Sequence, residues 1–306
     1  MANKPVVVPA SPSQWDAAFR LMFQHLPEDE RDSRIHNGLQ LVERQELDPA
    51  GVFVALVHGT VVGAQVCQQV PGASGLVWPP QTLDGPERPV LEDALIRHAA
   101  QWLRGRGVKL GQCLTTVEEA ALADPLVRNG FNHITRLCYL QHDLAEPDDP
   151  FPGPERLRYV SYPQLPEPAL LPATLWRTYE GTEDCPEITN ARTLDEVMEG
   201  HRVQGQFDPD IWWLALENDH PVGVILLCSV PECAAYDLSY LGVVPEHRGR
   251  GLGIEMMDHV LRFVRATGVA KLTLAVDSRN RAAFRLYSKL GFVPLDAREV
   301  FLAIWN

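Results

Sequence analysis

The sequence lacks any apolar run that approaches the roughly 18 residues of a membrane-spanning helix. It also lacks CxxC motifs: its six cysteines are scattered along 306 residues, which argues against a disulfide framework and against a zinc site. The opening segment, "MANKPVVVPA", has one lysine and a short apolar run interrupted by proline, too little for a secretory signal. We therefore expect a cytoplasmic protein with reduced thiols, no metal and no membrane contact.

Basic residues are in deficit. The chain has 27 lysines and arginines against 40 acidic residues, a formal charge of −13, so its long-range field repels nucleic acid and anionic membranes. Any anion that it binds must be held by local groups. Hydrophobic content of 45% with 22% charged residues is typical of a globular protein, and the length favours two domains.

The chain contains an internal duplication. The segment "FVALVHGTVVG" at 53–63 resembles "WLALENDHPVG" at 213–223, and each has two short apolar runs separated by a polar turn. Two further pairs keep nearly the same offset: "RGRGVKL" ending at 110 with "RATGVAKL" ending at 272, and "VRNGF" ending at 131 with "SKLGF" ending at 292. We infer two copies of one domain.

The boundary between the copies is predicted from proline. The segment "AEPDDPFPGPER", 145–156, holds four prolines and several acidic residues, which disfavour regular structure. We predict domains at 1–145 and 157–306 with a linker at 146–156. In each copy, strand-like runs alternate with segments of helical periodicity, such as 90–107 and 252–268, an α/β pattern.

The stretch "LSYLGVVPEHRGRGLGIEMM", 238–257, places three glycines between a predicted strand and a predicted helix. Glycines there let backbone N–H groups converge, and the helix N-terminus adds partial positive charge, so the turn predicts a phosphate site. A Walker loop needs Gly-Lys-Ser/Thr, which is absent. The dinucleotide motif GxGxxG needs a glycine at Ile254.

The pattern that fits is Arg/Gln-x-x-Gly-x-Gly/Ala, met by Arg248, Gly251 and Gly253. A second motif, N-x-x-A-x-x-L-Y-x-x-x-G-F, follows at Asn280, Ala283, Leu286, Tyr287, Gly291 and Phe292. With both motifs in this order, residues 157–306 closely resemble the GNAT acetyltransferase superfamily. The resemblance implies two tandem GNAT-like α/β domains, each with a mixed, mostly antiparallel sheet flanked by helices.

The resemblance also implies acetyl-CoA as cosubstrate. The residues expected to hold it lie on the strand end, the glycine loop and the second motif: Leu241, Gly242, Val243, Val244, Arg248, Gly249, Arg250, Gly251, Leu252, Gly253, Asn280 and Ala283. Arg248, Arg250, Arg279 and Arg281 form a basic cluster suited to phosphates, although the last two could also be a solvated helix start.

Two residues are expected to be catalytic. Tyr287 matches the GNAT tyrosine that protonates the departing thiolate, and its alternative role is a core aromatic. Asp237 stands eleven residues before Arg248, where several GNAT enzymes carry a glutamate base. Because aspartate is shorter, it would act through water, or it is a polar strand end. Strand alternation predicts Leu238 and Tyr240 on one face and Asp237 on the other, so Tyr240 and Asp237 can share a face only if the strand has a bulge.

The first copy departs from the GNAT pattern. A shift of about 161 positions places Glu87, Val90, Glu92 and Leu126 where the second copy has Arg248, Gly251, Gly253 and Tyr287. Carboxylates near a helix N-terminus would repel a diphosphate. The first domain therefore resembles a degenerate GNAT repeat without a phosphate loop, an arrangement similar to that of mycothiol synthase and its relatives.

These features predict an acetyl-CoA-dependent N-acetyltransferase acting on an amine of an unidentified small molecule or peptide, by direct attack in a ternary complex. The alternatives are a non-catalytic acyl-CoA binding or sensing protein and an acyltransferase that uses a longer acyl-CoA. Segment 178–209 is expected to shape the acceptor pocket, and its acidic residues, among them Glu180 and Asp184, either attract an amine or form a solvated surface. No pattern in the sequence indicates an oligomeric state.

Overall fold

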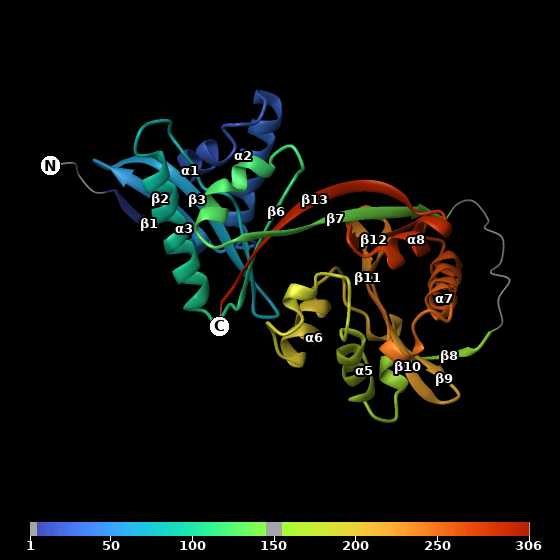
Figure 1. Ribbon diagram of the computed structural model, residues 1–306. Coiled ribbons are helices and arrows are strands. Elements are labelled where there is room, and N and C mark those ends of the chain that lie inside the picture. Colours follow the sequence, from blue (N-terminus) through green and yellow to red (C-terminus); the bar gives the residue numbers. More distant parts are fainter. Residues whose placement is uncertain (1–4, 145–154, 306) are drawn as a thin grey trace. The chain divides into compact units, whose positions relative to one another are not determined.

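The computed structural model describes residues 5–144 and 155–305, so most of the predicted linker, 146–154, lies outside the described residues. The chain forms two compact units, Met1–Ile134 with Glu299–Asn306 and Thr135–Arg298 (Figure 1). Among the described helices, none is long and apolar enough to cross a membrane.

The first unit is an α/β domain. Its strands and helices in chain order are β1 (Val6–Pro9), α1 (Trp15–Met22), α2 (Glu28–Glu43), β2 (Val52–Val57), β3 (Thr60–Val70), β4 (Ser74–Val77), β5 (Gln81–Thr82), α3 (Arg88–Arg104), β6 (Leu110–Thr115), α4 (Asp124–Arg128) and the start of β7 (Asn132–Asp143). The main sheet order is β1-β2-β3-β4-β6, followed by the end of β13. Only the β4–β6 pair in this series is parallel.

The second unit repeats this plan. Its elements are β8 (Leu157–Ser161), α5 (Leu170–Thr178), α6 (Leu194–Arg202), β9 (Trp212–Glu217), β10 (His220–Val230), β11 (Ala235–Val243), α7 (Leu252–Thr267), β12 (Lys271–Asp277), α8 (Arg281–Lys289) and β13 (Val293–Ile304). The sheet order is β8-β9-β10-β11-β12-β7, with β11 and β12 parallel and the other pairs antiparallel. The predicted fold class is confirmed in both units.

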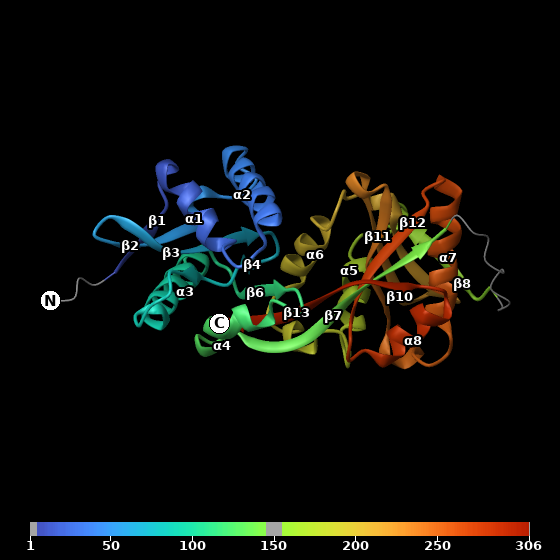
Figure 2. The same cartoon turned by 90° about the horizontal axis from the view of Figure 1, so that it is seen from above.

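Two core layers share the strands β8, β9, β10 and β11 of the second unit. In β9, Trp213 and Ala215 pack in the cluster that includes α7 and α8, whereas Trp212 and Leu214 pack in the cluster with α5 and α6. This alternation follows from the period of two in a strand, and it explains why these strands are apolar throughout. The two helical layers therefore cover opposite faces of the sheet (Figure 2).

The units exchange one strand. β7 belongs by sequence to the first copy, yet its residues 137–143 pair with β12 in the second unit. β13 belongs by sequence to the second copy, yet its residues 299–304 pair with β6 in the first unit. The compact units therefore depart from the predicted bounds of 1–145 and 157–306. Strand-like sequence specifies which residues alternate, but it does not specify which of two similar sheets a strand joins.

β11 and β12 separate partway along their length. They pair only between Ala235–Leu238 and Lys271–Leu274, so the ends of both strands diverge. β11 also has a bulge at Ser239, because Tyr240 is the partner of Leu226 while Leu238 is the partner of Leu227.

The bulge corrects the predicted alternation. Leu238 packs in the core with α7, whereas Tyr240 packs on the opposite face with α5 and α6. The two side chains therefore do not share a face. The extra residue reverses the side-chain direction after Ser239, so Asp237 points to the same side of the sheet as Tyr240.

Candidate active site

A cavity of about 430 Å³ fills the gap between the diverging ends of β11 and β12, within the second unit. Its walls come from β11, the glycine loop, the start of α7, α8 and the loop after α5. The predicted cofactor residues that line it are Leu241, Gly242, Val243, Arg248, Gly249, Gly251, Leu252, Gly253, Asn280 and Ala283. Val244 is instead fully buried in the core, and Arg250 lies outside the lining.

The glycine loop presents backbone donors to this cavity. Gly249 and Gly251 have φ values of +73° and +81°, which favour glycine, and Gly251 is the N-cap residue of α7. In the first helical turn, the N–H groups of Ile254 and Glu255 donate to the Gly251 carbonyl, and those before them have no acceptor within the helix. A Cβ built on Gly249 would meet no atom within 4 Å, so the loop is open. The positive end of α7 and these donors fit a diphosphate.

The arginines of the loop bind protein groups. The guanidinium of Arg248 donates to three main-chain carbonyls, those of Thr178 at 2.8 Å, Gly181 at 3.0 Å and Val243 at 3.0 Å. Arg250 donates two bonds of 2.9 Å to the carboxylate of Glu217. Arg248 therefore ties the end of α5 to the glycine loop. The backbone N–H groups, rather than free guanidinium groups, are the donors that the loop offers to an anion.

α8 supplies the predicted acid. Tyr287 lines the cavity while 7% exposed, and its ring packs against Phe292 with centroids 5.5 Å apart, so it lies in the core and in the site at once. Burial raises the pKa of its phenol, which keeps the proton on the oxygen at neutral pH. Asn280 lines the cavity and also caps α8, because its Oδ1 accepts the Ala283 N–H at 3.1 Å.

Asp237, the predicted base, lies outside the cavity lining. Thr273 Oγ1 donates to its Oδ1 at 2.7 Å. Burial raises the pKa of Asp237, and the Thr273 hydrogen bond opposes that effect. Any contact between this carboxylate and a molecule in the cavity would need a bridging water.

Two cavity residues, Tyr240 and Thr178, were not predicted as site residues, and Asp184 was named only among several acidic residues that could attract an amine. Tyr240 and Thr178 share a hydrogen bond of 2.7 Å, and a Cβ on Gly242 would lie only 2.6 Å from the Tyr240 hydroxyl, so glycine is required there. Asp184 lies in the loop after α5 and lines the cavity. Its acidic character was visible in the sequence, but among 40 acidic residues that signal was not specific.

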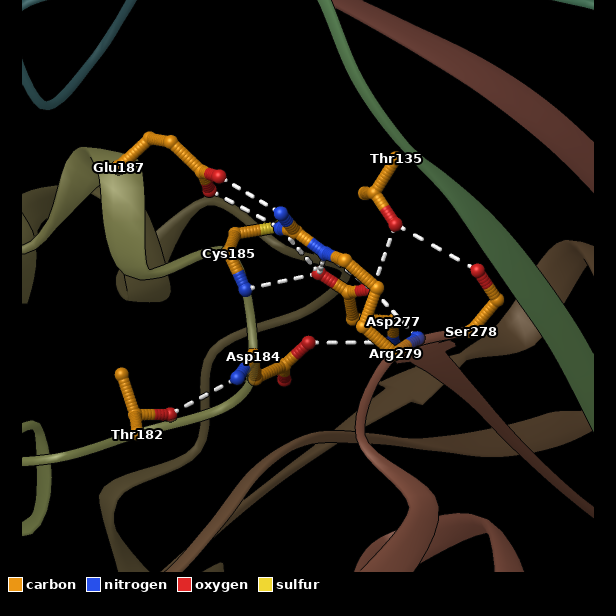
Figure 3. Close-up of polar contacts among 8 residues, drawn as sticks. All are labelled: Thr135, Thr182, Asp184, Cys185, Glu187, Asp277, Ser278 and Arg279. Atoms are coloured by element: carbon orange, nitrogen blue, oxygen red, sulfur yellow. Dashed lines mark hydrogen bonds and ion pairs between the residues drawn. The ribbon is translucent and has the colours of Figure 1, made fainter.

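Two hydrogen bonds, each from a backbone N–H to a carboxylate, connect the Asp184 loop with Asp277. We name this pair of bonds the Asp184–Asp277 latch (Figure 3). The N–H of Asp277 donates to Asp184 Oδ1 at 3.1 Å. The N–H of Cys185 donates to Asp277 Oδ2 at 3.0 Å. The loop after α5 is therefore fixed to the end of β12, beside the cavity residues Ala275 and Val276.

Asp277 is fully buried at the centre of an ion-pair network. Arg279 donates to both of its oxygens and to Glu187, and Thr135 Oγ1 donates to its Oδ1 at 2.5 Å (Figure 3). Burial opposes the charge, but the hydrogen bonds from Arg279 and Thr135 outweigh it and lower the pKa of Asp277 to about 2. Ligand atoms of Asp184, Cys185 and Asp277 lie within 4.8 Å of one another, but a cation there would face the Arg279 guanidinium.

Residues 175–292 match the family described as Acetyltransferase (GNAT) family, and this span contains the diverging strands, the glycine loop and α8. The second unit of the chain therefore carries a GNAT-family domain. The protein is an acyltransferase, and acyl-CoA is the cosubstrate of the superfamily in general.

Among curated proteins, this GNAT protein is 29% identical over 283 residues to a mycothiol acetyltransferase of Beutenbergia cavernae, covering 88% of this chain and 86% of the relative. It is 32% identical over 167 residues to a mycothiol acetyltransferase of Nocardiopsis dassonvillei, covering 45% of this chain and 49% of that relative. The tandem type that the sequence predicted is thus confirmed along most of the chain.

Solved structures share the fold. A GCN5-related N-acetyltransferase from Sphaerobacter thermophilus superposes with a TM-score of 0.62 at 17% identity, covering 98% of this chain and 95% of that chain. A tandem GNAT protein from the clavulanic acid biosynthesis pathway has a TM-score of 0.52 at 17% identity and covers 98% of both chains.

The first unit of this GNAT protein has a carboxylate where the second has its glycine loop. Glu92, in the second turn of α3, is 3% exposed. It accepts hydrogen bonds from Arg88 at 2.7 Å and from Arg128 at 2.6 Å. A buried charge paired in this way is costly to break, and its negative charge near the N-terminal end of α3 would disfavour a phosphate.

Proposed function

We propose that this GNAT protein transfers an acetyl group from acetyl-CoA to a primary amine of a small molecule or peptide, by direct attack in a ternary complex. The proposal rests on one observation: the exposed backbone N–H groups of the glycine loop and the buried Tyr287 line the same cavity. The second unit carries this site, and the first unit, whose Glu92 is ion-paired, has a structural or acceptor-shaping role.

We assign different residues of the cavity to different parts of the reaction. The glycine loop and the start of α7 bind the diphosphate. Near Gly242 and Val243, the side of β11 that is not paired with β12 offers main-chain groups to the pantetheine arm. An N–H there also stabilises negative charge on the thioester oxygen during attack. Tyr287, protonated at neutral pH, gives its proton to the sulfur as the carbon–sulfur bond breaks.

The attacking amine must first lose a proton, because alkylammonium groups have pKa values near ~10. Three carboxylates are candidates for the base. Asp237, predicted from the sequence, would act through a bridging water, whereas Asp184 and the exposed Glu183 stand in the cavity lining.

The proposal assigns both the acyl group, which is acetyl, and the acceptor, which is a small molecule or peptide. The relatives named mycothiol acetyltransferases support a small-molecule acceptor. A longer acyl-CoA is the competing donor, and a comparison of acetyl-CoA with octanoyl-CoA as substrates separates the two. Faster transfer from the longer donor would replace the acetyl assignment.

Calorimetric titration with acetyl-CoA tests the site. We expect one site per chain, and we expect Gly251→Val to weaken binding at least tenfold, because its side chain enters the open loop. Gly268→Val is the matched control: Gly268, at the other end of α7, has φ +78° and open space for a Cβ. Both variants carry a left-handed strain of about 1–2 kcal/mol, but only Gly251→Val should lose binding.

Absence of binding in the unaltered protein would contradict the proposed function. Two sites per chain would contradict the assignment of the first unit, and equal losses in the two glycine variants would show that strain, not the loop, determines binding.

A further inference from the structure

The cavity contains a carboxylate oxygen without a protein partner. Asp184 lines the cavity together with Tyr240 and Tyr287. Its Oδ1 accepts the Asp277 N–H at 3.1 Å. Within the described residues, its Oδ2 accepts no hydrogen bond, so this oxygen is available to a donor that enters the cavity.

The latch fixes the direction of this carboxylate. Asp184 N–H donates to Thr182 Oγ1 at 3.0 Å, and the next residue, Cys185, donates its N–H to Asp277. Asp277 is itself immobilised by Arg279, so the chain on both sides of Asp184 is held by hydrogen bonds. A reacting group on a loop must be held in this way if it is to meet a substrate in one orientation.

The surroundings of Asp184 favour a proton acceptor. Its titratable neighbours are Asp277 and Arg279 at the end of β12, Cys185 and the exposed Glu183 beside it, Tyr179 after α5, Tyr240 on β11 and Tyr287 on α8. Burial raises the pKa of Asp184, and the charge of Asp277 adds to this effect, whereas the Asp277 N–H and Arg279 oppose it. Two neighbouring carboxylates with pKa values moved in opposite directions are typical of a site in which only one of them exchanges a proton.

Resting on the proposed function, we propose that Asp184 binds the acceptor amine as its ammonium ion and takes the proton that frees the nitrogen lone pair for attack. The ammonium N–H bond breaks, its proton goes to Asp184 Oδ2, and the neutral amine forms the new carbon–nitrogen bond. The carbon–sulfur bond then breaks, and Tyr287 supplies the proton of the thiol. The second proton lost from nitrogen replaces the one that Tyr287 gave, and Asp184 releases its proton to solvent.

This assignment prefers Asp184 to Asp237 on geometry. Asp184 lies in the lining that also contains Tyr287, whereas Asp237 is engaged by Thr273 and lies outside that lining. The assignment also names the acceptor class. Glu183 is a second carboxylate of the lining, but it is exposed and no hydrogen bond within the described residues holds it, whereas Asp184 is held in one orientation. A fixed carboxylate oxygen beside the cavity favours a primary ammonium that donates directly to it over an anionic group or a neutral alcohol.

The test compares Asp184→Asn with Glu180→Gln and Asp237→Asn in the full chain. Asparagine keeps an oxygen for the Asp277 N–H, so the latch and the fold are retained. Glu180 is an exposed carboxylate of the same loop outside the cavity lining, which makes it the matched loss of charge. CoA release is measured with ethanolamine, glucosamine, putrescine and glycinamide, and acetyl-CoA affinity is measured by calorimetry.

We expect Asp184→Asn to lower kcat/KM by about a hundredfold or more, with acetyl-CoA affinity within twofold of the unaltered protein and Glu180→Gln unchanged. In the unaltered protein, activity should fall as pH decreases through a pKa above the ordinary aspartate range, and this acidic limb should be absent in Asp184→Asn.

Turnover in Asp184→Asn at the unaltered rate, or a larger loss in Asp237→Asn, would overturn the assignment and leave the proposed function standing. Acetyl-CoA binding without turnover of any of the four amines would overturn the proposed function, and the role of Asp184 would fall with it.

Discussion

At the scale of single residues, Tyr287 gives the sharpest prediction. Its hydroxyl is the only change in Tyr287→Phe, and the ring contact with Phe292 remains, so the fold should be unaffected. We expect CoA release to slow by about a hundredfold to ten-thousandfold, the range of general acid catalysis, while acetyl-CoA still binds. A rate like that of the unaltered protein, measured beside equal thermal stability, would remove Tyr287 from the mechanism.

Site residues were predictable from the sequence where the local backbone conformation or a helix end restricts the residue type. Gly251 could be found because a left-handed N-cap needs glycine, and Asn280 because a helix start needs a cap. Asp184 was not singled out, because its position depends on a hydrogen bond to Asp277, far along the chain. Arg248 was predicted for phosphate, but three carbonyls of its own unit accept from its guanidinium, a geometry that no motif displays.

At the scale of elements, the contact between β8 and α7 should make stability depend on pH. Tyr159 of β8 stacks on His259 of α7 with ring centroids 3.9 Å apart, and Trp213 lies edge-on at 4.9 Å. Burial lowers the pKa of His259 from 6.5 to about 4. The unfolded chain therefore binds a proton at a pH where the folded chain does not, so stability should decrease as pH falls from about 6.5 to 4.

Thermal melts at several pH values measure this effect in the unaltered protein and in His259→Phe. Phenylalanine keeps the stacking and cannot be protonated, so the decrease should become smaller. It should not vanish, because burial also lowers the pKa of His201 to about 4. An equal decrease in both proteins would show that His259 is accessible to protons in the folded state.

Elements with strong periodicity were predictable, and irregular ones were not. The long apolar period of 252–268 predicted the helix that is α7. The bulge at Ser239 arises from the pairing of β11 with β10, so the alternation of β11 alone predicted the wrong side for Tyr240.

At the scale of the whole molecule, the exchanged strands predict that neither copy folds alone. A chain of residues 157–306 lacks β7, so β12 would lose its antiparallel partner, and Leu140 would be missing from the core. Its β13 end would also lose β6 and expose Phe301. We expect this fragment to aggregate, because unpaired strand edges and apolar surface promote association.

Solubility after expression and circular dichroism of the fragment, beside the full chain, check this expectation. A second fragment, residues 132–298, restores β7 and removes the unpartnered end of β13, so it should be the more soluble of the two. A cooperative melt of residues 157–306 would contradict the expectation and indicate that its own β13 can replace β7.

Sequence duplication predicted two similar α/β units, but not the residues that complete each of them. The two copies carry strands of similar pattern at β7 and β13, so local pairing preferences do not distinguish the sheets. Only the connection lengths and the packing of residues such as Leu140 and Phe301 decide the partner.

The same exchange sets an order of events during synthesis. The ribosome makes β6 long before residues 299–304, which are its neighbours in the sheet. The first unit is thus translated first and finished last, and until then one edge of its sheet has no strand beside it. Pairings between such distant positions are slow to form. The first unit should therefore need chaperones most in the period before residues 299–304 pair with β6.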